Sequence, residues 1–264
     1  MILAMEWPFV ITLGAFGAIL GSFLNACVFR LPRGISMIRP PSACPRCGTH
    51  IRWHDNVPVI GWLALRGRCR SCRERISPRY PVVEGLTALL FALLALRYGA
   101  TPALIPALLF AWLMLLVTLV DFDARIIPDA VTLPGTVLGL VMAWLGPMPF
   151  RDALVGAVAG LCLLWGIAWA YERVTGIEGM GGGDIKFAAL LGAFLGWQGL
   201  LLTLFLASLG GALAGGLLML RKKGTGKTAL PFGSFLAPAG LVVYVFGGEI
   251  LAWYVATAFR GRLN

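Results

Sequence analysis

The chain has 264 residues, of which 59% are apolar and only 13% are charged, and its mean hydropathy is +0.84. This composition excludes an ordinary soluble domain and predicts a protein made mostly of membrane-spanning helices. The net charge of +10 does not by itself indicate a nucleic-acid partner, because cytoplasmic loops of membrane proteins collect Lys and Arg.

Apolar runs long enough to cross roughly 30 Å of hydrocarbon recur along the whole chain. We expect about eight of them, at 7–29, 82–98, 103–121, 131–147, 152–171, 185–197, 199–220 and 232–257. The first run is interpreted as a retained span rather than a signal peptide, because its arginines follow it and no basic residue precedes it. The sequence therefore predicts an all-α polytopic membrane protein.

The distribution of basic residues predicts the orientation of these spans. Eleven of the 22 Lys and Arg residues lie between Arg30 and Arg79, which places that segment in the cytoplasm. A second basic loop, at 221–230, falls on the same side. We expect three parts: a first transmembrane helix at 1–29, an arginine-rich cytoplasmic loop domain at 30–81, and a transmembrane domain at 82–264.

Two Cys-x-x-Cys pairs lie in the loop domain, Cys44 and Cys47 in CPRCG and Cys69 and Cys72 in CRSC, with 21 residues between them. Four thiolates in this pattern can surround a zinc ion tetrahedrally. Such a site would be structural, because four protein ligands leave no position for water or substrate. Two disulfide bonds are the alternative, which a reducing cytoplasm disfavours.

Carboxylates are costly in a membrane and are often functional. Eight of the twelve are placed in loops or near the outer face, including Glu84 at the edge of the large loop and Glu178 in a polar connection. The others stand at the cytoplasmic ends of apolar runs: Asp121, Asp123 and Asp129 in VDFDARIIPD, and Asp184 in GMGGGDIKF.

Two carboxylates at one membrane depth suit aspartyl protease chemistry, in which the pair shares one proton and supplies both an acid and a base. The glycines at 181–183 would let the backbone approach an extended peptide and adopt positive φ. Helix capping is the alternative role for Asp129 and Asp184. We favour capping for Asp129, which follows Pro128, and catalysis for Asp184.

Five segments together resemble the type IV prepilin peptidase family, and they occur in the family's order over nearly the whole chain. They are GSFLNACVFRLPRG at 21–34, the paired cysteines, VDFDARIIPD at 120–129, GMGGGDIKF at 179–187 and LPFGSFLAPAG at 230–240. The resemblance implies an intramembrane aspartyl protease of the Gly-x-Gly-Asp type, with Asp121 and Asp184 as the catalytic pair. Ser234 departs from the family pattern, because it stands where we expect proline.

The resemblance also implies the reaction. The basic leader of a type IV prepilin or type II secretion pseudopilin is cleaved after a glycine, at the cytoplasmic face of the bacterial inner membrane. The new N-terminal residue is then methylated with S-adenosylmethionine. The four cysteines of the loop match the zinc-binding cysteines of bifunctional members, and members without that loop are expected to be peptidases only.

The residues alone reveal no methyl-donor site. By hypothesis, Asn25 and Arg30 help the arginine-rich loop to form it. Because a basic loop should repel a basic leader, we expect its arginines to contact anionic lipid head groups. Four acidic residues would then attract the leader: Asp121, Asp123, Asp129 and Glu178.

Two other classes of protein fit parts of the pattern. A proton- or cation-coupled transporter could use the aspartates as a relay, but such sites lie near mid-membrane between inverted repeats, which the sequence does not show. A membrane scaffold could recruit a partner through the zinc loop without any catalysis. The two interpretations differ for Asp184→Asn, which should leave the function of a scaffold intact but should inactivate a protease.

Overall fold

The computed structural model describes residues 3–220 and 232–259. The described residues are helical or irregular, and their only strand-like pairings are two isolated β-bridges. The chain divides into two compact units, residues 1–104 and 105–264. The basic loop expected at 221–230 lies outside the described residues.

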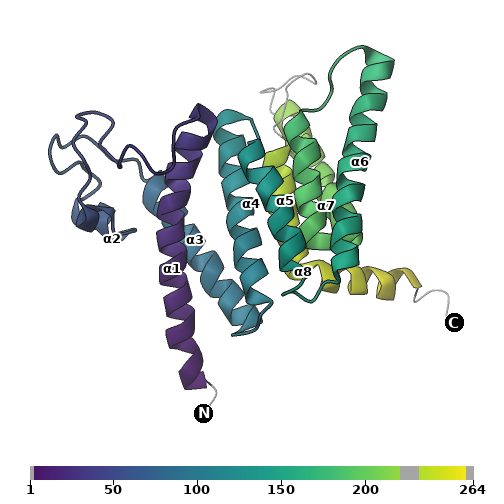
Figure 1. Ribbon diagram of the computed structural model, residues 1–264, viewed down its shortest axis with the longest axis horizontal. Coiled ribbons are helices and arrows are strands. Elements are labelled where there is room, and N and C mark those ends of the chain that lie inside the picture. The colour runs from purple at the N-terminus through teal and green to yellow at the C-terminus, as the bar shows by residue number, and fades with distance from the viewer. Residues whose placement is uncertain (1–2, 221–231, 260–264) are drawn as a thin grey trace. The chain divides into compact units, whose positions relative to one another are not determined.

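The first unit contains two long helices, α1 (Leu3–Arg30) and α3 (Arg79–Tyr98), that pack against each other (Figure 1). Gly17 and Gly21 of α1 make this close packing possible. A side chain at Gly17 would meet Phe91 at 2.9 Å, and one at Gly21 would meet the Cα atom of Glu84 at 2.8 Å. The segment between the helices forms a loop with three short helices: η1 (Leu31–Arg33), η2 (Trp53–Asn56) and α2 (Ile60–Ala64).

The second unit is a bundle of five helices (Figure 1), of which α7 contacts α5, α6 and α8. The helices are α4 (Leu104–Ala124), α5 (Asp129–Met142), α6 (Phe150–Thr175), α7 (Gly182–Leu220) and α8 (Gly233–Phe259). Phe110 of α4 lies in the buried interior. Its ring stacks on Tyr244 of α8 and makes a tilted contact with Phe194 of α7, with ring centroids 4.8 and 4.9 Å apart.

Small residues bring the backbones of α6 and α7 together. A Cβ atom on Gly192 would lie 2.0 Å from the carbonyl oxygen of Gly156, and one on Gly160 would lie 2.4 Å from that of Ala188. Only glycine fits at such a crossing, which is typical of helix packing in membranes. This contact fixes the position of the N-terminal part of α7, the part that carries Asp184.

The expectation of eight spans is not confirmed. Six helices of the described chain are long and apolar enough to cross a membrane, whereas α5 has only 14 residues. The runs expected at 185–197 and 199–220 both lie within α7, which the non-helical Gly196 (φ 67°, ψ 176°) divides into two helices. Hydropathy located the long helices and the division near Gly196, but it did not show that α5 ends at Met142.

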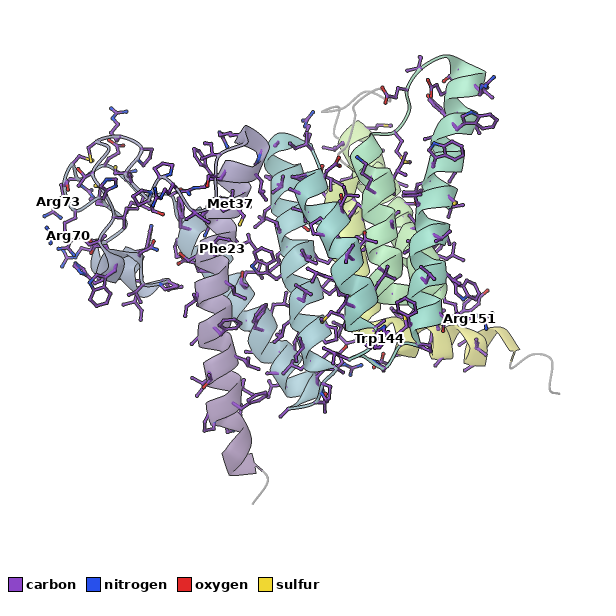
Figure 2. All side chains as sticks on the ribbon, viewed as in Figure 1. Phe23, Met37, Arg70, Arg73, Trp144 and Arg151 are labelled. Carbon is purple, nitrogen blue, oxygen red and sulfur yellow. The ribbon has the colours of Figure 1, made fainter. Side chains whose placement is uncertain are left out.

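Large apolar side chains project outward from these helices, among them Phe23 on α1 and Trp144 just after α5 (Figure 2). Trp144 is 78% exposed. Helices that are apolar on every face belong in lipid. The protein is therefore a multi-pass, all-α membrane protein.

Candidate functional site

Asp121 lies in the last turn of α4, where the chain turns sharply towards α5. Its side chain is only 4% exposed. The turn is closed by the amide of Arg125, which donates to the carbonyl oxygen of Asp121 at 2.8 Å. Arg125 itself has a positive φ of 54°, a left-handed conformation that commonly ends helices. The buried Ile127 follows, and α5 begins two residues later.

Asp184 lies in the first turn of α7, beside the same turn of the chain. A Cβ atom on Gly183 would lie 3.0 Å from the carbonyl oxygen of Ile127, so this glycine is needed for close approach. Gly181 and Gly182 are exposed. A Cβ atom added to Gly182 would meet no atom within 4 Å, and one added to Gly181 would meet only the side chain of Asp184, at 3.8 Å. The expectation of positive φ was wrong, because none of these three glycines adopts it.

The start of α8 completes the site. A Cβ atom on Gly233 would lie 3.1 Å from Cγ of Asp121 and 2.8 Å from Cδ1 of Ile127. The next residue, Ser234, donates its hydroxyl hydrogen to Oδ2 of Asp121 at 2.7 Å. An added Cβ atom on Gly183, the neighbour of Asp184, would likewise lie 3.1 Å from Cβ of Ile127. The ends of three helices thus gather around two acidic side chains.

The other two candidate aspartates lie outside this arrangement. Asp123 is exposed near the end of α4. Asp129 is the first residue of α5, and its Oδ2 accepts a hydrogen bond from Nζ of Lys186 on α7 at 2.6 Å. The expectation that Asp129 caps its helix was wrong, since no side-chain capping bond forms there. Its carboxylate is instead drawn to a cation on a neighbouring helix.

The four cysteines of the loop come together as the sequence predicted. All four sulfur atoms lie within 4.8 Å of one another. Cys44 and Cys72 are 3.8 Å apart and Cys47 and Cys69 are 4.0 Å apart, measured between sulfur atoms. Zinc–sulfur bonds of about 2.3 Å place tetrahedral ligands about 3.8 Å apart, whereas a disulfide needs about 2.05 Å. The arrangement therefore fits a zinc ion and excludes the disulfide alternative.

Each cysteine pair lies in a tight turn of the same design. The carbonyl oxygen of Cys44 accepts a hydrogen bond from the amide of Gly48 at 2.9 Å. The carbonyl oxygen of Cys69 accepts one from the amide of Arg73 at 3.1 Å. Both closing residues have positive φ, 69° and 59°. Hydrogen bonds from the side chain and backbone of Thr49 lower the pKa of the Cys47 thiol to about 6.

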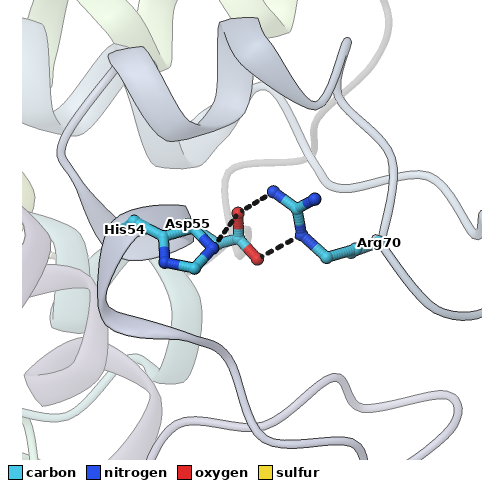
Figure 3. A network of polar contacts seen from close by, with 3 residues as sticks. All are labelled: His54, Asp55 and Arg70. Carbon is cyan, nitrogen blue, oxygen red and sulfur yellow. Dashed lines mark hydrogen bonds and ion pairs between the residues drawn. The ribbon is translucent and has the colours of Figure 1, made fainter.

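An ion pair connects the two halves of the loop. Asp55 of η2 accepts two hydrogen bonds from Arg70, at 2.8 and 2.5 Å, and His54 lies 3.7 Å from the same carboxylate (Figure 3). The hydrogen bond from Arg70 lowers the pKa of Asp55. Arg70 stands between Cys69 and Cys72, so this contact holds η2 beside the second cysteine pair.

Two side chains of the long helices hold the ends of the loop, and a third binds its middle. Arg30, the last residue of α1, donates to the carbonyl oxygens of Ser36, Met37 and Pro40 at 2.7–3.2 Å. Asn25 donates to the carbonyl of Tyr80 at 3.2 Å. Glu84, which is 7% exposed, accepts a hydrogen bond from the amide of Val59 at 2.7 Å.

Comparison with known proteins finds matches over most of the chain. A family model described as the Bacterial Peptidase A24 N-terminal domain matches residues 15–98, and the Type IV leader peptidase family matches residues 108–216. A protein of Pseudomonas putida named prepilin leader peptidase/N-methyltransferase is 43% identical over 95% of each chain. The chain belongs to the type IV leader peptidase family. The resemblance in the sequence motifs is thereby confirmed.

Other relatives of the type IV leader peptidase family carry the same name. The protein from Pseudomonas aeruginosa is 39% identical over 95% of this chain and 94% of its own. The protein from Neisseria gonorrhoeae is 35% identical over 96% of this chain and 97% of its own. No solved structure matches the chain.

Sequence reasoning missed two residues at these sites. Glu84 was assigned to the edge of the loop, although an acidic residue inside an apolar helix is itself a signal of function. Ser234 was noticed only as a departure from the family pattern. Its contact with Asp121 joins residues 113 positions apart, and no sequence pattern reports such a pairing.

Proposed function

We propose that this chain cleaves the basic leader from prepilins or pseudopilins and then methylates the new N-terminus, with Asp121 and Asp184 as the catalytic pair. The observation that carries the proposal is that the elements bearing Asp121, Asp184 and Ser234 converge on Ile127 and Asp121 at the ends of three membrane helices. Relatives named for both activities match 95% of the chain, which supports the same conclusion.

The peptidase step follows from two carboxylates that share a proton. The ionised group removes a proton from a water molecule, while the protonated group donates a hydrogen bond to the scissile carbonyl. The water oxygen attacks the carbonyl carbon, and the resulting tetrahedral intermediate breaks its C–N bond as the leaving amine takes up a proton. General acid–base catalysis of this kind contributes about 10²–10⁴-fold to the rate.

The surroundings of Asp184 suit an extended substrate. Gly181 and Gly182 are exposed and leave open space beside the carboxylate, so a peptide backbone can approach without meeting a side chain. The exposed carboxylates of Asp123 and Glu178 add negative charge that would attract a basic leader. Asp129 contributes less to this attraction, because Lys186 neutralises it.

The methyltransferase half is assigned to the loop domain at 30–81 and the peptidase half to the transmembrane domain at 82–264. Cys44, Cys47, Cys69 and Cys72 hold a structural zinc ion that folds the loop. S-adenosylmethionine supplies the methyl group. Asn25 and Arg30 act by fixing the backbone at the two ends of the loop, which is a supporting role for the methyl-transfer site rather than direct contact.

The loop, Asp121 and Asp184 are placed on the cytoplasmic face of the bacterial inner membrane. The concentration of arginines in the loop supports this orientation. The same arginines suit contact with anionic lipid head groups. The substrate leader, which is basic, then meets the carboxylates on the side where prepilins are made.

Mass spectrometry tests the proposal directly. Purified protein in detergent is incubated with S-adenosylmethionine and a synthetic prepilin segment that carries a basic leader ending in glycine. The proposal predicts a product without the leader and with the mass of one methyl group added. If folded protein leaves every prepilin and pseudopilin segment intact, the proposed function is wrong and the scaffold interpretation takes its place.

A further inference from the structure

Ser234 makes a hydrogen bond of a different kind from those of four threonines in the helices. Thr87, Thr118, Thr136 and Thr203 each donate to the carbonyl oxygen four residues earlier in their own helix. This is the usual bond of a helical hydroxyl and carries no functional meaning. Ser234 donates instead to a carboxylate on a different helix, Oδ2 of Asp121 on α4, at 2.7 Å.

The backbone of α8 aims this hydroxyl. The first turn of α8 is fixed by the amides of Phe235 and Leu236, which both donate to the carbonyl of Phe232 at 3.0 Å. Gly233 brings this turn against Asp121, where any larger residue would meet the carboxylate at 3.1 Å. Ser234 therefore approaches Asp121 from a regular helix and not from a loose loop.

The carboxylate that receives the bond is almost fully buried. A short bond to a buried carboxylate fixes the orientation of that group, because few other partners are within its reach. With Oδ2 held by Ser234, the other oxygen, Oδ1, remains for the catalytic water and the proton shared with Asp184.

We propose that Ser234 is a positioning residue for the peptidase reaction, which holds the carboxylate of Asp121 in the orientation that leaves Oδ1 for chemistry. The inference rests on the proposed function, since it assumes that Asp121 is one of the catalytic pair. Ser234 touches neither substrate nor water in this role. It contributes to turnover and not to leader binding.

The test compares Ser234→Ala, Ser234→Thr and a control, Thr203→Val, by measuring kcat and KM for leader cleavage. Loss of a hydrogen bond to a charged group slows a reaction about tenfold or more when that bond stabilises the transition state. Ser234→Ala is therefore expected to lower kcat about tenfold with KM unchanged. Ser234→Thr keeps the hydroxyl group and should therefore keep most of the wild-type kcat. Thr203→Val removes a buried hydroxyl that binds only its own helix and should match the wild type.

Methyl transfer to a pre-cleaved peptide is measured on the same preparations, because a local effect on cleavage should leave that reaction, which is assigned to the loop domain, unchanged. The inference is overturned if Ser234→Ala keeps the wild-type kcat, if it changes KM alone, or if it lowers methyl transfer in parallel with cleavage. These outcomes leave the proposed function intact, provided that the wild type cleaves. A wild type that cleaves no prepilin segment would instead contradict the proposed function itself.

Discussion

The amide nitrogen of Val59 lies 2.7 Å from Oε2 of Glu84, so a buried carboxylate of α3 holds a turn of the cysteine loop. Val59 has φ 60° and ψ −51°, a conformation that costs a β-branched residue about 1–3 kcal/mol. The bond to Glu84 helps to maintain this strained turn. The loop is thus attached to the helices through a contact that is distinct from its metal site.

Replacing Glu84 should affect methyl transfer and not cleavage. Glu84→Ala leaves the strained Val59 without its acceptor, and we expect methyl transfer to a pre-cleaved peptide to fall roughly tenfold. Glu84→Gln keeps an acceptor oxygen and should lose much less. Both rates are measured on the same preparation. Equal losses of cleavage and methyl transfer in Glu84→Ala would contradict the assignment of the loop to methylation.

Zinc should be present at one ion per chain, as measured by elemental mass spectrometry of the purified protein. Cys47→Ser should lose it, because three thiolates and one hydroxyl bind zinc far more weakly than four thiolates. Limited proteolysis should then cut the loop while the helices stay intact. Cys162→Ser, which removes an exposed cysteine on α6, is the matched control and should retain the metal. Undiminished zinc in Cys47→Ser would show that the cluster is not the metal site.

The ion pair between Lys186 and Asp129 predicts an effect on leader affinity. Exposed ion pairs contribute only about 0.2–1 kcal/mol to stability, so Lys186→Gln should leave the unfolding temperature almost unchanged. It also frees the negative charge of Asp129. The KM for a segment with a basic leader should therefore fall about twofold at low salt, and the difference should shrink as salt screens the charges. Adding Asp129→Asn to Lys186→Gln should return KM to its wild-type value. A low KM that persists in the double variant would exclude the charge of Asp129 as the cause.

The crossing of α6 and α7 should not tolerate a side chain. Gly192→Val would place a Cβ atom 2.0 Å from the carbonyl oxygen of Gly156, and overpacking of this kind costs about 3 kcal/mol. We expect a clear loss of thermal stability in detergent, together with loss of cleavage, because the start of α7 shifts. Gly166→Val on α6, where an added Cβ would meet nothing within 4 Å, is the control. Equal melting temperatures for the two variants would contradict the packing described here.

Much of the fold follows from local properties of the sequence. Apolar runs marked the long helices because lipid requires apolar surface, and the cysteine spacing predicted the four-thiol cluster because each pair forms a turn of its own. The four-residue spacing of Gly17 and Gly21 is a local pattern typical of close helix packing, and α1 packs closely on α3 at both positions. These features depend on residues that are near one another in the chain.

Long-range pairings were the part that the sequence did not reveal. Asp129 looked like a helix cap because it follows Pro128, yet its partner is Lys186, 57 residues away. Ser234 and Glu84 were misjudged for the same reason, since their partners lie on other elements. The resemblance selected Asp121 over Asp123, and the structure supplies a physical difference between them: Asp121 is buried and Asp123 is exposed.

The central claim is that Asp121 and Asp184 act together on the peptide bond. The most direct measurement is the rate of leader release, by mass spectrometry, for Asp121→Asn, Asp184→Asn and Asp123→Asn beside the wild type. We predict that each of the first two falls at least about 100-fold while Asp123→Asn stays within a few-fold of the wild type, and that all three still methylate a pre-cleaved peptide. Retention of wild-type cleavage by Asp121→Asn or Asp184→Asn would contradict the account.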